Sequence, residues 1–323
     1  MSVYPIGSPT VVALGGGHGL SASLSALRLM TDRLTAIVTV ADDGGSSGRL
    51  REELGVLPPG DLRMALAALC DDSEWGRTWR DLLQHRFTST GDLNQHAVGN
   101  LLIVALWELL DDPVGGLDWV GKLLGARGRV LPMASVPLSL EAEVAIGGDV
   151  VTVVGQSQVA STAGRVENIR LTPSDPPACP EAVDAIMAAD WIVLGPGSWF
   201  SSVMPHLLVP DLARALHETR GRRCLTLNLS RDTDETLGMT TIEHLRALYR
   251  HAPDLRIDAV VADPSAVEDP DLLIKEAEHM GATLLMRQVG RGDGTPRHDA
   301  LRLAAAYRDV FDKFLGDVGT ISR

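Results

Sequence analysis

Cysteine and basic residues are scarce in this sequence, and their scarcity excludes several classes of protein. The three cysteines, Cys70, Cys179 and Cys224, are odd in number, lie far apart and form no CxxC pair. We therefore expect neither a disulfide framework nor a zinc site. Lysine and arginine number 29 against 42 acidic residues, for a net charge of −13. Such a chain has no general basic field, so neither nucleic acid nor an anionic membrane is expected as a partner.

Long hydrophobic runs are lacking too. The longest, "LLIVALWELL" from Leu101, is too short to span a bilayer and contains Glu108. The first residues, "MSVYPIGSPT", have neither the basic nor the apolar region of a secretory signal peptide. Hydrophobic residues still make up 45% of the chain, which is enough for a sizeable core. We expect a cytoplasmic protein with no membrane partner.

Motifs of nucleophilic catalysis are also missing. The chain has no HExxH motif and no Ser–His–Asp order, and "GPGSW" at 195–199 does not match the G-x-S-x-G elbow. No lysine follows its glycines as in a P-loop. The sequence offers instead glycine-rich turns, each placed after a short apolar run.

The order of these runs predicts an α/β fold. A β-branched run at 10–14 leads into "GGGHG", a helix-period stretch at 20–30 and a second apolar run at 34–41, as in a parallel βαβ unit. The same rhythm returns after Ala182. Between these halves we expect a helical insertion over 61–130 and a small β subdomain over 134–170. The subdomain contains a hairpin that turns at Gly147-Gly148.

The first glycine turn has the features of an anion site. "GGGHGLSA" contains G-x-G-x-x-A from Gly17 to Ala22, after a strand and before a helix. Glycines let the backbone come close to a ligand, and the helix start directs free N–H groups towards phosphate. A tight turn without a ligand is the alternative. The candidate ligand-binding residues here are Gly15, Gly16, Gly17, His18 and Gly19.

The segment after the second strand, "ADDGGSSGRL", combines both charge signs with flexible residues. Asp42 and Asp43 lie roughly where a dinucleotide fold places its ribose-binding carboxylate, and either could hold Mg²⁺. We expect a flexible loop that folds over a ligand, and a solvated loop is the alternative. Its further candidate ligand-binding residues are Gly44, Gly45, Ser46 and Arg49.

Three later segments add candidates. "GPGSWFSS" repeats the strand, turn and helix-start pattern, so Gly195, Gly197 and Ser198 are a second anion cradle, or Ser198 is a simple helix N-cap. "GDLNQHAVGNLL" supplies Asn94, His96 and Asn100, although a lone histidine is more often structural than catalytic. Asn228 begins "NLSRDTDET", a site segment or a solvated loop.

Four motifs together resemble the gluconeogenesis factor family of bacteria, which is related to the 2-phospho-L-lactate transferases of deazaflavin cofactor synthesis. They are "GGGHGLS", "IVTVADDGGSSGRLREELGVLPPGDLR", "GDLNQHAVGNLL" and "GPGSWFSSVMPHLLV", and the resemblance covers about Val11 to Val289. His18 stands where that family usually has threonine, and "NLSRDTDET" departs from its usual "N-[LI]-M-T-Q-P-G-E-T".

The resemblance implies a fold and a ligand. The fold is a single Rossmann-like α/β domain over 1–323, a three-layer parallel sheet with an added subdomain, forming a homodimer. The gluconeogenesis factor branch is needed for normal cell shape on gluconeogenic carbon sources and binds a UDP-N-acetylglucosamine-type nucleotide sugar. In the transferase relatives, the aspartates matching Asp42 and Asp43, and one near Asp61, belong to the metal and phosphate site.

Three functions remain open from the sequence. The first is a regulatory protein that binds a nucleotide sugar and is read by a cell-wall-regulating partner. The second is a Mg²⁺-dependent 2-phospho-L-lactate-type transferase that acts on a deazaflavin. The third, an NAD-dependent oxidoreductase, depends on the glycine motif alone. No catalytic residue and no certain cofactor can be assigned.

Overall fold

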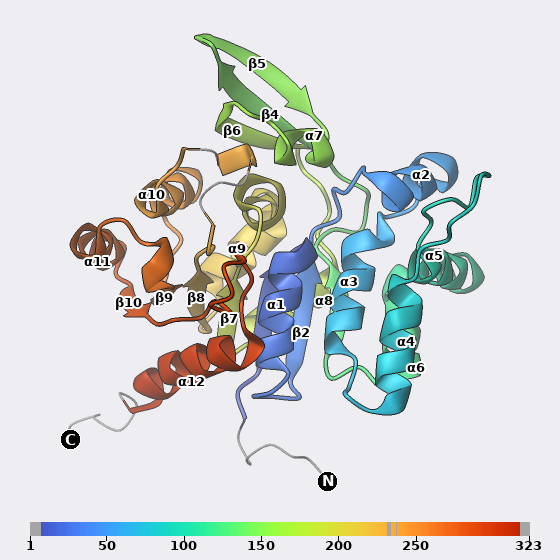
Figure 1. Cartoon of the computed structure of the whole chain (residues 1–323), viewed down its shortest axis with the longest axis horizontal. Coiled ribbons are helices and arrows are strands. Elements are labelled where there is room, and N and C mark those ends of the chain that lie inside the picture. Colours follow the sequence, from blue (N-terminus) through green and yellow to red (C-terminus); the bar gives the residue numbers. More distant parts are fainter. Residues whose placement is uncertain (1–7, 231–233, 237, 317–323) are drawn as a thin grey trace.

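The computed structural model describes residues 8–230, 234–236 and 238–316. Its centre is a seven-stranded sheet of order β10-β9-β8-β7-β1-β2-β3, in which all neighbouring strands are parallel. Helices cover both faces of this sheet (Figure 1), which confirms the predicted three-layer α/β fold. The strands are β1 Val11–Gly15, β2 Leu34–Val38, β3 Arg129–Pro132, β7 Trp191–Leu194, β8 Arg222–Thr226, β9 Ala259–Ala262 and β10 Thr283–Met286.

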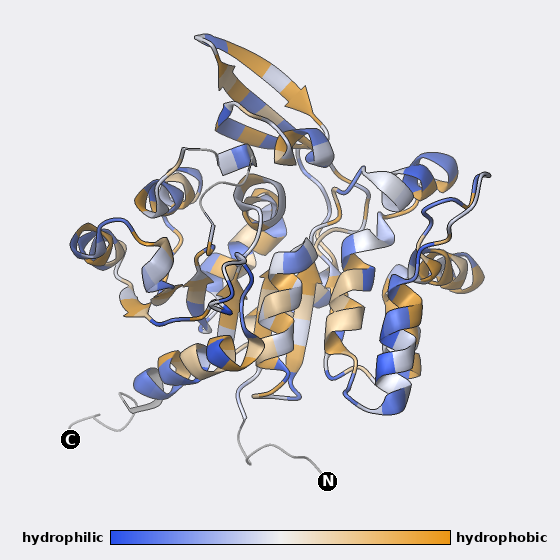
Figure 2. Cartoon of the chain, viewed as in Figure 1, coloured by the Kyte–Doolittle hydropathy of each residue, from blue (hydrophilic) through white to orange (hydrophobic). Residues whose placement is uncertain are grey.

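The central strands form because their sequences are apolar on both sides. A parallel sheet is covered on each face, so its strands are continuous apolar runs without alternation. Val11 to Leu14 in β1 and Ile192 to Leu194 in β7 have no solvent exposure. Figure 2 shows the hydrophobic colour concentrated along these strands and on the inner sides of the helices. This buried layer fixes the strand ends, and with them the loops that follow.

The strand order reverses at β1. The chain passes from β1 through α1 (Gly17–Leu27) to β2 on one side, while β7 pairs with β1 on the other side. In doubly wound sheets, ligands bind in the crevice that opens at such a switch point, beyond the carboxyl ends of the strands. Both predicted glycine turns, at 15–19 and 195–197, follow these two strands.

The helical segment on the β2 side differs in two places from the prediction. The acidic, glycine-rich stretch expected as a flexible loop forms helix α2 (Gly45–Leu54). Gly48 makes this possible because a Cβ there would lie 2.1 Å from the carbonyl oxygen of Asp43. The expected insertion over 61–130 also ends in strand β3, whose short, partly exposed run gave no strand pattern. The helices of this region are α3 Pro59–Leu69, α4 Glu74–Gln84, α5 Val98–Leu110 and α6 Pro113–Leu124.

The second half differs at one point. After the turn at 195–197 the chain forms a π-helical turn, Trp199–Val203, and a 3-10 turn, Met204–Leu208, rather than the expected regular helix. Pro205 and Pro210 interrupt the hydrogen bonding that a longer helix would need. The remaining helices are α8 Pro180–Ala188, α9 Pro210–Glu218, α10 Thr241–His251, α11 Pro270–His279 and α12 Ala300–Gly316.

A small antiparallel sheet stands above the carboxyl edge of the main sheet (Figure 1). The predicted hairpin forms from β4 (Ser139–Ile146) and β5 (Asp149–Val154), joined by Gly147 and Gly148 at φ 62° and 101°. Strand β6 (Arg165–Thr172) pairs with the other edge of β4, and the short helix α7 (Gln156–Ala160) closes the base.

Tyr307 ties α12 to the centre of the fold. Its hydroxyl is fully buried and lies 2.7 Å from Ser23 Oγ on α1 and 3.0 Å from Thr226 Oγ1 at the end of β8. Ser23 Oγ also donates to the carbonyl of Gly195, at 2.8 Å. One hydroxyl network therefore fastens α12, α1 and the second glycine turn together.

We predict that Tyr307→Phe lowers the free energy of unfolding by about 1–2 kcal/mol, because the buried Thr226 hydroxyl loses its partner. Urea denaturation followed by circular dichroism measures this difference. Tyr249→Phe is the matched control, since Tyr249 is 43% exposed, and it should change stability by less than about 0.5 kcal/mol. Equal stability of the two variants would contradict the network.

Candidate functional site

The two glycine turns touch each other at the carboxyl edge of the sheet. A Cβ on Gly19 would lie 2.2 Å from the carbonyl oxygen of Pro196 and 2.4 Å from Cα of Gly197. Gly17 has a φ of +54°, which favours glycine. The loops after β1 and β7 therefore form one surface, and the first turn of α1 lies within it. The sequence-predicted Gly15, Gly16, Gly17, Gly19, Gly195 and Gly197 are all brought together here.

Asn228 holds the second turn in place. Its Oδ1 accepts from the amide of Gly197 at 2.8 Å, and its Nδ2 donates to the carbonyl of the same residue at 2.8 Å. This paired contact uses the side-chain amide from the loop after β8 to fix the backbone after β7. Asn228 thus shapes the crevice through Gly197.

Asp61 lies directly behind the first glycine turn. Its Oδ2 is 2.4 Å from the position that a Cβ on Gly16 would take. Asp61 is only partly buried, and the protein packed around its carboxyl group raises its pKa to about 7 by desolvation, with a further rise from Asp42. The Gly17 amide and Arg63 oppose this shift. Asp61 and Asp42 therefore form an acidic pair beside the amides that suit a phosphate.

The residues around this pair fit a magnesium ion. Oδ2 of Asp42 and Oγ of Ser47 both lie within 3 Å of a Cβ position on Gly60, at 2.8 and 2.3 Å. Ser47 is 2% exposed, and its hydroxyl has no hydrogen-bond partner among the described residues. Mg²⁺ is usually held by one or two carboxylates, waters and substrate phosphates. Asp42, Asp61 and Ser47 offer such a set, although no group of three or more His, Cys, Asp or Glu side chains converges within the described chain.

A buried polar network adjoins the site on the α3 side. Ser46 Oγ lies 3.0 Å from Nδ1 of His96 and accepts from Nδ2 of Asn100 at 3.0 Å, and Asn100 Oδ1 accepts from Nε of Arg63 at 2.8 Å. Burial lowers the pKa of His96, and nearby Arg49 adds to this. A neutral His96 that accepts the Ser46 proton suits the structural interpretation of this histidine. The network fixes α2 to α5 and places the Arg63 charge near Asp61 and Asp42.

Three of the sequence candidates lie outside the crevice. Asp43 Oδ1 accepts from the amide of Ser157 in α7, at 2.9 Å, so it fastens the base of the small sheet. Arg49 donates to the carbonyls of Asp92 and Asn94, and Asn94 Oδ1 accepts from Ser89 within an exposed loop. A separate hollow of about 610 Å³, lined by Asp43, Gly45 and Arg49 among others, lies between α2 and β4.

The second expected anion cradle is occupied by the protein itself. The amides of Phe200 and Ser201 each donate to the carboxylate of Glu235, at 3.1 Å, and burial raises the pKa of Glu235 to about 7. Ser198 makes no side-chain capping bond. Glu235 comes from the segment whose sequence departs from the family pattern, and residues 231–233 of that segment lie outside the described residues. The first turn therefore remains the candidate anion site.

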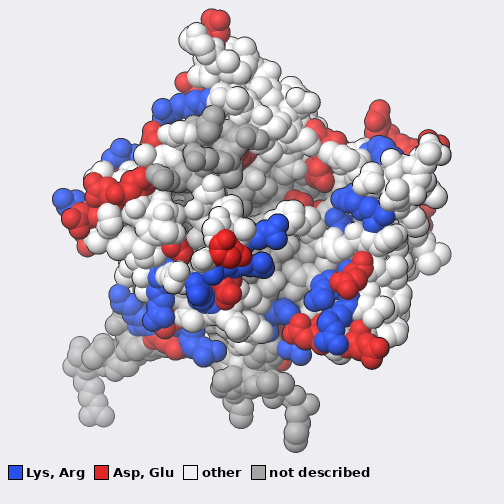
Figure 3. Space-filling model, viewed as in Figure 1, with Lys and Arg blue, Asp and Glu red and all other residues white. Residues whose placement is uncertain are grey.

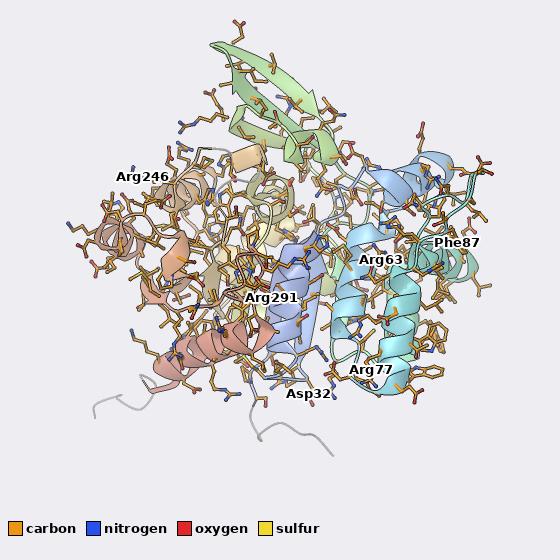
Figure 4. The ribbon with its side chains drawn as sticks, in the orientation of Figure 1. Asp32, Arg63, Arg77, Phe87, Arg246 and Arg291 are labelled. Atoms are coloured by element: carbon orange, nitrogen blue, oxygen red, sulfur yellow. The ribbon has the colours of Figure 1, made fainter. Side chains whose placement is uncertain are left out.

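Sequence reasoning proposed His18 beside this turn but missed Arg80 and Arg86, which line the same groove. A groove of about 480 Å³ between α1, α3 and α4 contains His18, Arg63, Arg80 and Arg86. Figure 3 shows basic side chains on both sides of the hollowed middle of this face. Figure 4 places Arg63 on α3 and Arg291 in the loop before α12, on opposite sides of α1. The glycine- and arginine-rich stretch "GRGDGTPRH", after the last strand, was the pattern that could have indicated this loop.

The fold and site define the class of the protein. It is a doubly wound α/β protein in which two glycine turns meet at the switch point of the sheet. The family model described as 2-phospho-L-lactate transferase CofD matches residues 11–288. The chain belongs to that family. None of its described helices combines the length and apolar character that crossing a membrane requires.

Relatives of high identity carry a more specific name. A Mycobacterium leprae protein named "Putative gluconeogenesis factor" is 52% identical over 316 residues, covering 95% of this chain and 88% of its own. A Bacillus subtilis protein named "Gluconeogenesis factor" is 35% identical, covering 94% and 98%. A crystal structure of a UPF0052 family protein from Bacillus halodurans is similar with a TM-score of 0.82, 33% identity and coverage of 92% and 98%.

We predict that Asp61→Asn stabilises the protein at alkaline but not at acidic pH. The pKa of Asp61 is raised in the folded state from 3.8 to about 7, so its stabilising contribution is complete below about pH 4 and lost above about pH 7. The variant has no charge to bury, and its stability relative to wild type should increase by about 2 kcal/mol between pH 5 and pH 8, allowing for the partial exposure of Asp61.

Thermal unfolding of both proteins at the two pH values measures this effect. The comparison cancels Glu235, which is present in both proteins. Asp92→Asn, at an exposed position, is the control and should behave alike at both pH values. A constant difference between Asp61→Asn and wild type would show that Asp61 is ionised in the folded protein throughout this range.

Proposed function

We propose that the protein is a cytoplasmic regulatory protein that binds a UDP-N-acetylglucosamine-type nucleotide sugar and is needed for cell shape during gluconeogenic growth. The observation that carries the proposal is the glycine turn at 15–19, placed at the switch point of the sheet. In the proposed complex, a protein partner that regulates the cell wall binds this protein and distinguishes its ligand-bound form from its ligand-free form. The protein acts as a homodimer.

The first turn of α1 suits the diphosphate of such a ligand. It contains no acidic residue of its own, and its N-cap residue Gly16 makes no side-chain bond, although the Gly17 amide donates to the Asp61 carboxyl. The helix dipole and the remaining amides of the first turn favour an anion there. Arg63 and the loop that carries Arg291 add positive charge on the two sides of α1 (Figure 4). Asp61, with its pKa near neutral, accommodates the phosphate charge either by holding a proton or by sharing Mg²⁺ with Asp42.

The orientation of Asp42 argues against NAD as the ligand. In a dinucleotide fold, the carboxylate after the second strand accepts hydrogen bonds from the ribose. Here Asp42 Oδ1 accepts from the amide of Gly44 at 2.9 Å, and Oδ2 is directed to Gly60 on α3. Its free oxygen is thus turned towards the acidic pair and a metal, rather than along the strand edge towards a second ribose.

The alternative function is a Mg²⁺-dependent 2-phospho-L-lactate-type transferase. The family match over 11–288 and the Asp42, Asp61 and Ser47 oxygens favour it. Here a deazaflavin hydroxyl oxygen bonds to the lactate-bearing phosphorus of a guanosine diphosphate adduct, and guanosine monophosphate leaves. Mg²⁺ would neutralise the phosphate charge. The transferase proposal fails if incubation with both substrates and Mg²⁺ gives no deazaflavin phospholactate by mass spectrometry.

The nucleotide-sugar proposal predicts binding that depends on Gly16. Gly16→Ala keeps an ordinary backbone, because φ is −153°, but its Cβ collides with Oδ2 of Asp61 at 2.4 Å. We expect the affinity for UDP-N-acetylglucosamine to fall at least about tenfold, or about 1.4 kcal/mol, in isothermal titration calorimetry. Gly91→Ala, which meets open space, should bind as wild type. Absence of heat with the wild-type protein at millimolar ligand would reject the proposal.

The adjacent aspartates should respond differently to Mg²⁺. We expect Mg²⁺ to strengthen nucleotide binding by wild type, because it neutralises Asp42, Asp61 and the diphosphate together. Asp42→Asn should lose most of this increase, whereas Asp43→Asn should keep it, because Asp43 contacts Ser157 instead. Titrations with and without Mg²⁺ measure the increase. Equal loss in both variants would place the metal elsewhere in the loop.

A further inference from the structure

Strand β5 has a free edge at the outside of the protein. The small sheet has the order β5-β4-β6, so only one edge of β5 is paired within the described part of the chain. Figure 1 shows β5 as the outer strand of the projecting hairpin, and Figure 2 shows it largely in the hydrophobic colour. An exposed strand edge presents unpaired N–H and C=O groups to any other strand of matching shape.

Nothing in the β5 sequence protects this edge. Proteins usually guard edge strands with lysine, proline or inward-pointing charge. The strand reads "DVVTVV", with its single charge at the turn end. Val150, Val151 and Val154 are 59%, 41% and 57% exposed. Four valines and a threonine, all β-branched, favour an extended strand and pack well across a strand pair.

The sequence of β5 is symmetric about Thr152. Val151 and Val153 flank this residue, and Val150 and Val154 follow on either side. In an antiparallel pair of identical strands centred on Thr152, each valine therefore faces a valine and threonine faces threonine. A contact between two copies around a twofold axis must be complementary to itself, and this strand satisfies that condition without opposing any like charges.

The alternation of backbone hydrogen bonds along the β4–β5 hairpin agrees with this register. Gly155 N donates to the Leu140 carbonyl at 2.8 Å, and the register pairs Val153 with Ala142 and Val151 with Val144. Hydrogen-bonded pairs alternate along an antiparallel ladder, so the backbone groups of 151 and 153 face β4. Those of 150, 152 and 154 face the free edge, where the symmetric register requires them.

We propose that β5 is the self-association surface of this protein, pairing antiparallel with β5 of a second copy about a twofold axis at Thr152. The two three-stranded sheets then form one continuous sheet. The contact also reaches the crevice loop, because α7 follows β5 directly and its Ser157 amide donates to Asp43, the neighbour of Asp42. Helix α7 thus connects the proposed dimer contact on β5 with the loop that carries Asp42 and Asp43.

A charge-swap experiment tests both the surface and its register. In V150K/V154K, each substituted position faces a lysine of the second copy, so the dimer should dissociate at least about tenfold more readily. In V150K/V154E, the introduced ammonium at 150 faces the introduced carboxylate at 154 of the second copy, and association should return. Sedimentation equilibrium of the full chain, without nucleotide, measures all three proteins independently of any ligand proposal.

Two further variants complete the test. T152P removes an N–H that faces the free edge and leaves the β4 ladder intact, so it should weaken association while circular dichroism stays unchanged. L109K makes the same kind of change at a helix residue that is 77% exposed, and should associate as wild type. A monomeric wild type, a dimer that persists in V150K/V154K, or a V150K/V154E protein that stays monomeric would each overturn the proposal.

Discussion

The close contact between the two glycine turns is the constraint on which the rest of the site depends. Parallel pairing of β1 with β7 brings the two turns so near that Gly19 has no room for a side chain, while the φ of +149° at Gly197 favours glycine there. Asn228 and Ser23 then hold the second turn from two further elements. This contact fixes the backbone of the first glycine turn, and with it the direction in which the amides of α1 point. Asp61 can approach the first turn only because Gly16 has no Cβ.

The acidic pair of Asp61 and Asp42 lowers the stability of the folded protein, and this loss of stability suggests that the pair has a functional role. A carboxyl group whose pKa is raised to about 7 destabilises the folded protein at neutral pH relative to a neutral side chain. Asp61 lies beside the Gly17 amide and interacts with Asp42, whose Oδ2 lies near a Ser47 hydroxyl that has no hydrogen-bond partner among the described residues. These groups together suit a cation and a phosphate. Glu235, with a similarly raised pKa, has both its oxygens bonded to amides and so serves the fold. Glu235 is thus fully bonded within the protein, whereas Asp61 can still interact with a cation or a ligand.

The sequence was sufficient where local pattern decides structure. The run at 10–14, the glycines and the helix-period residues predicted β1, its turn and α1, and the pair Gly147-Gly148 predicted the hairpin. The sequence was insufficient where contacts between residues far apart in the chain decide the local structure. Residues 45–54 form α2 because Ser46 is held by His96 and Asn100 and because Gly48 packs on Asp43. The second cradle is filled by Glu235, which lies 35 and 34 residues further along the chain than the two amides that donate to it.

Asp42 and Asp43 show how one loop can serve two parts of the molecule. Because they are adjacent, their side chains leave the backbone in different directions: Asp42 towards α3 and Asp61, Asp43 towards Ser157 at the base of the small sheet. A ligand can shift association only if it binds the paired and unpaired forms with different free energies. The Asp43 contact supplies a physical route for such a difference, since movement of Asp42 towards a metal or phosphate must also move the residue that fastens α7. Had the two carboxylates served the same site, as their sequence position first suggested, the crevice and the hairpin would have no side-chain connection through this loop.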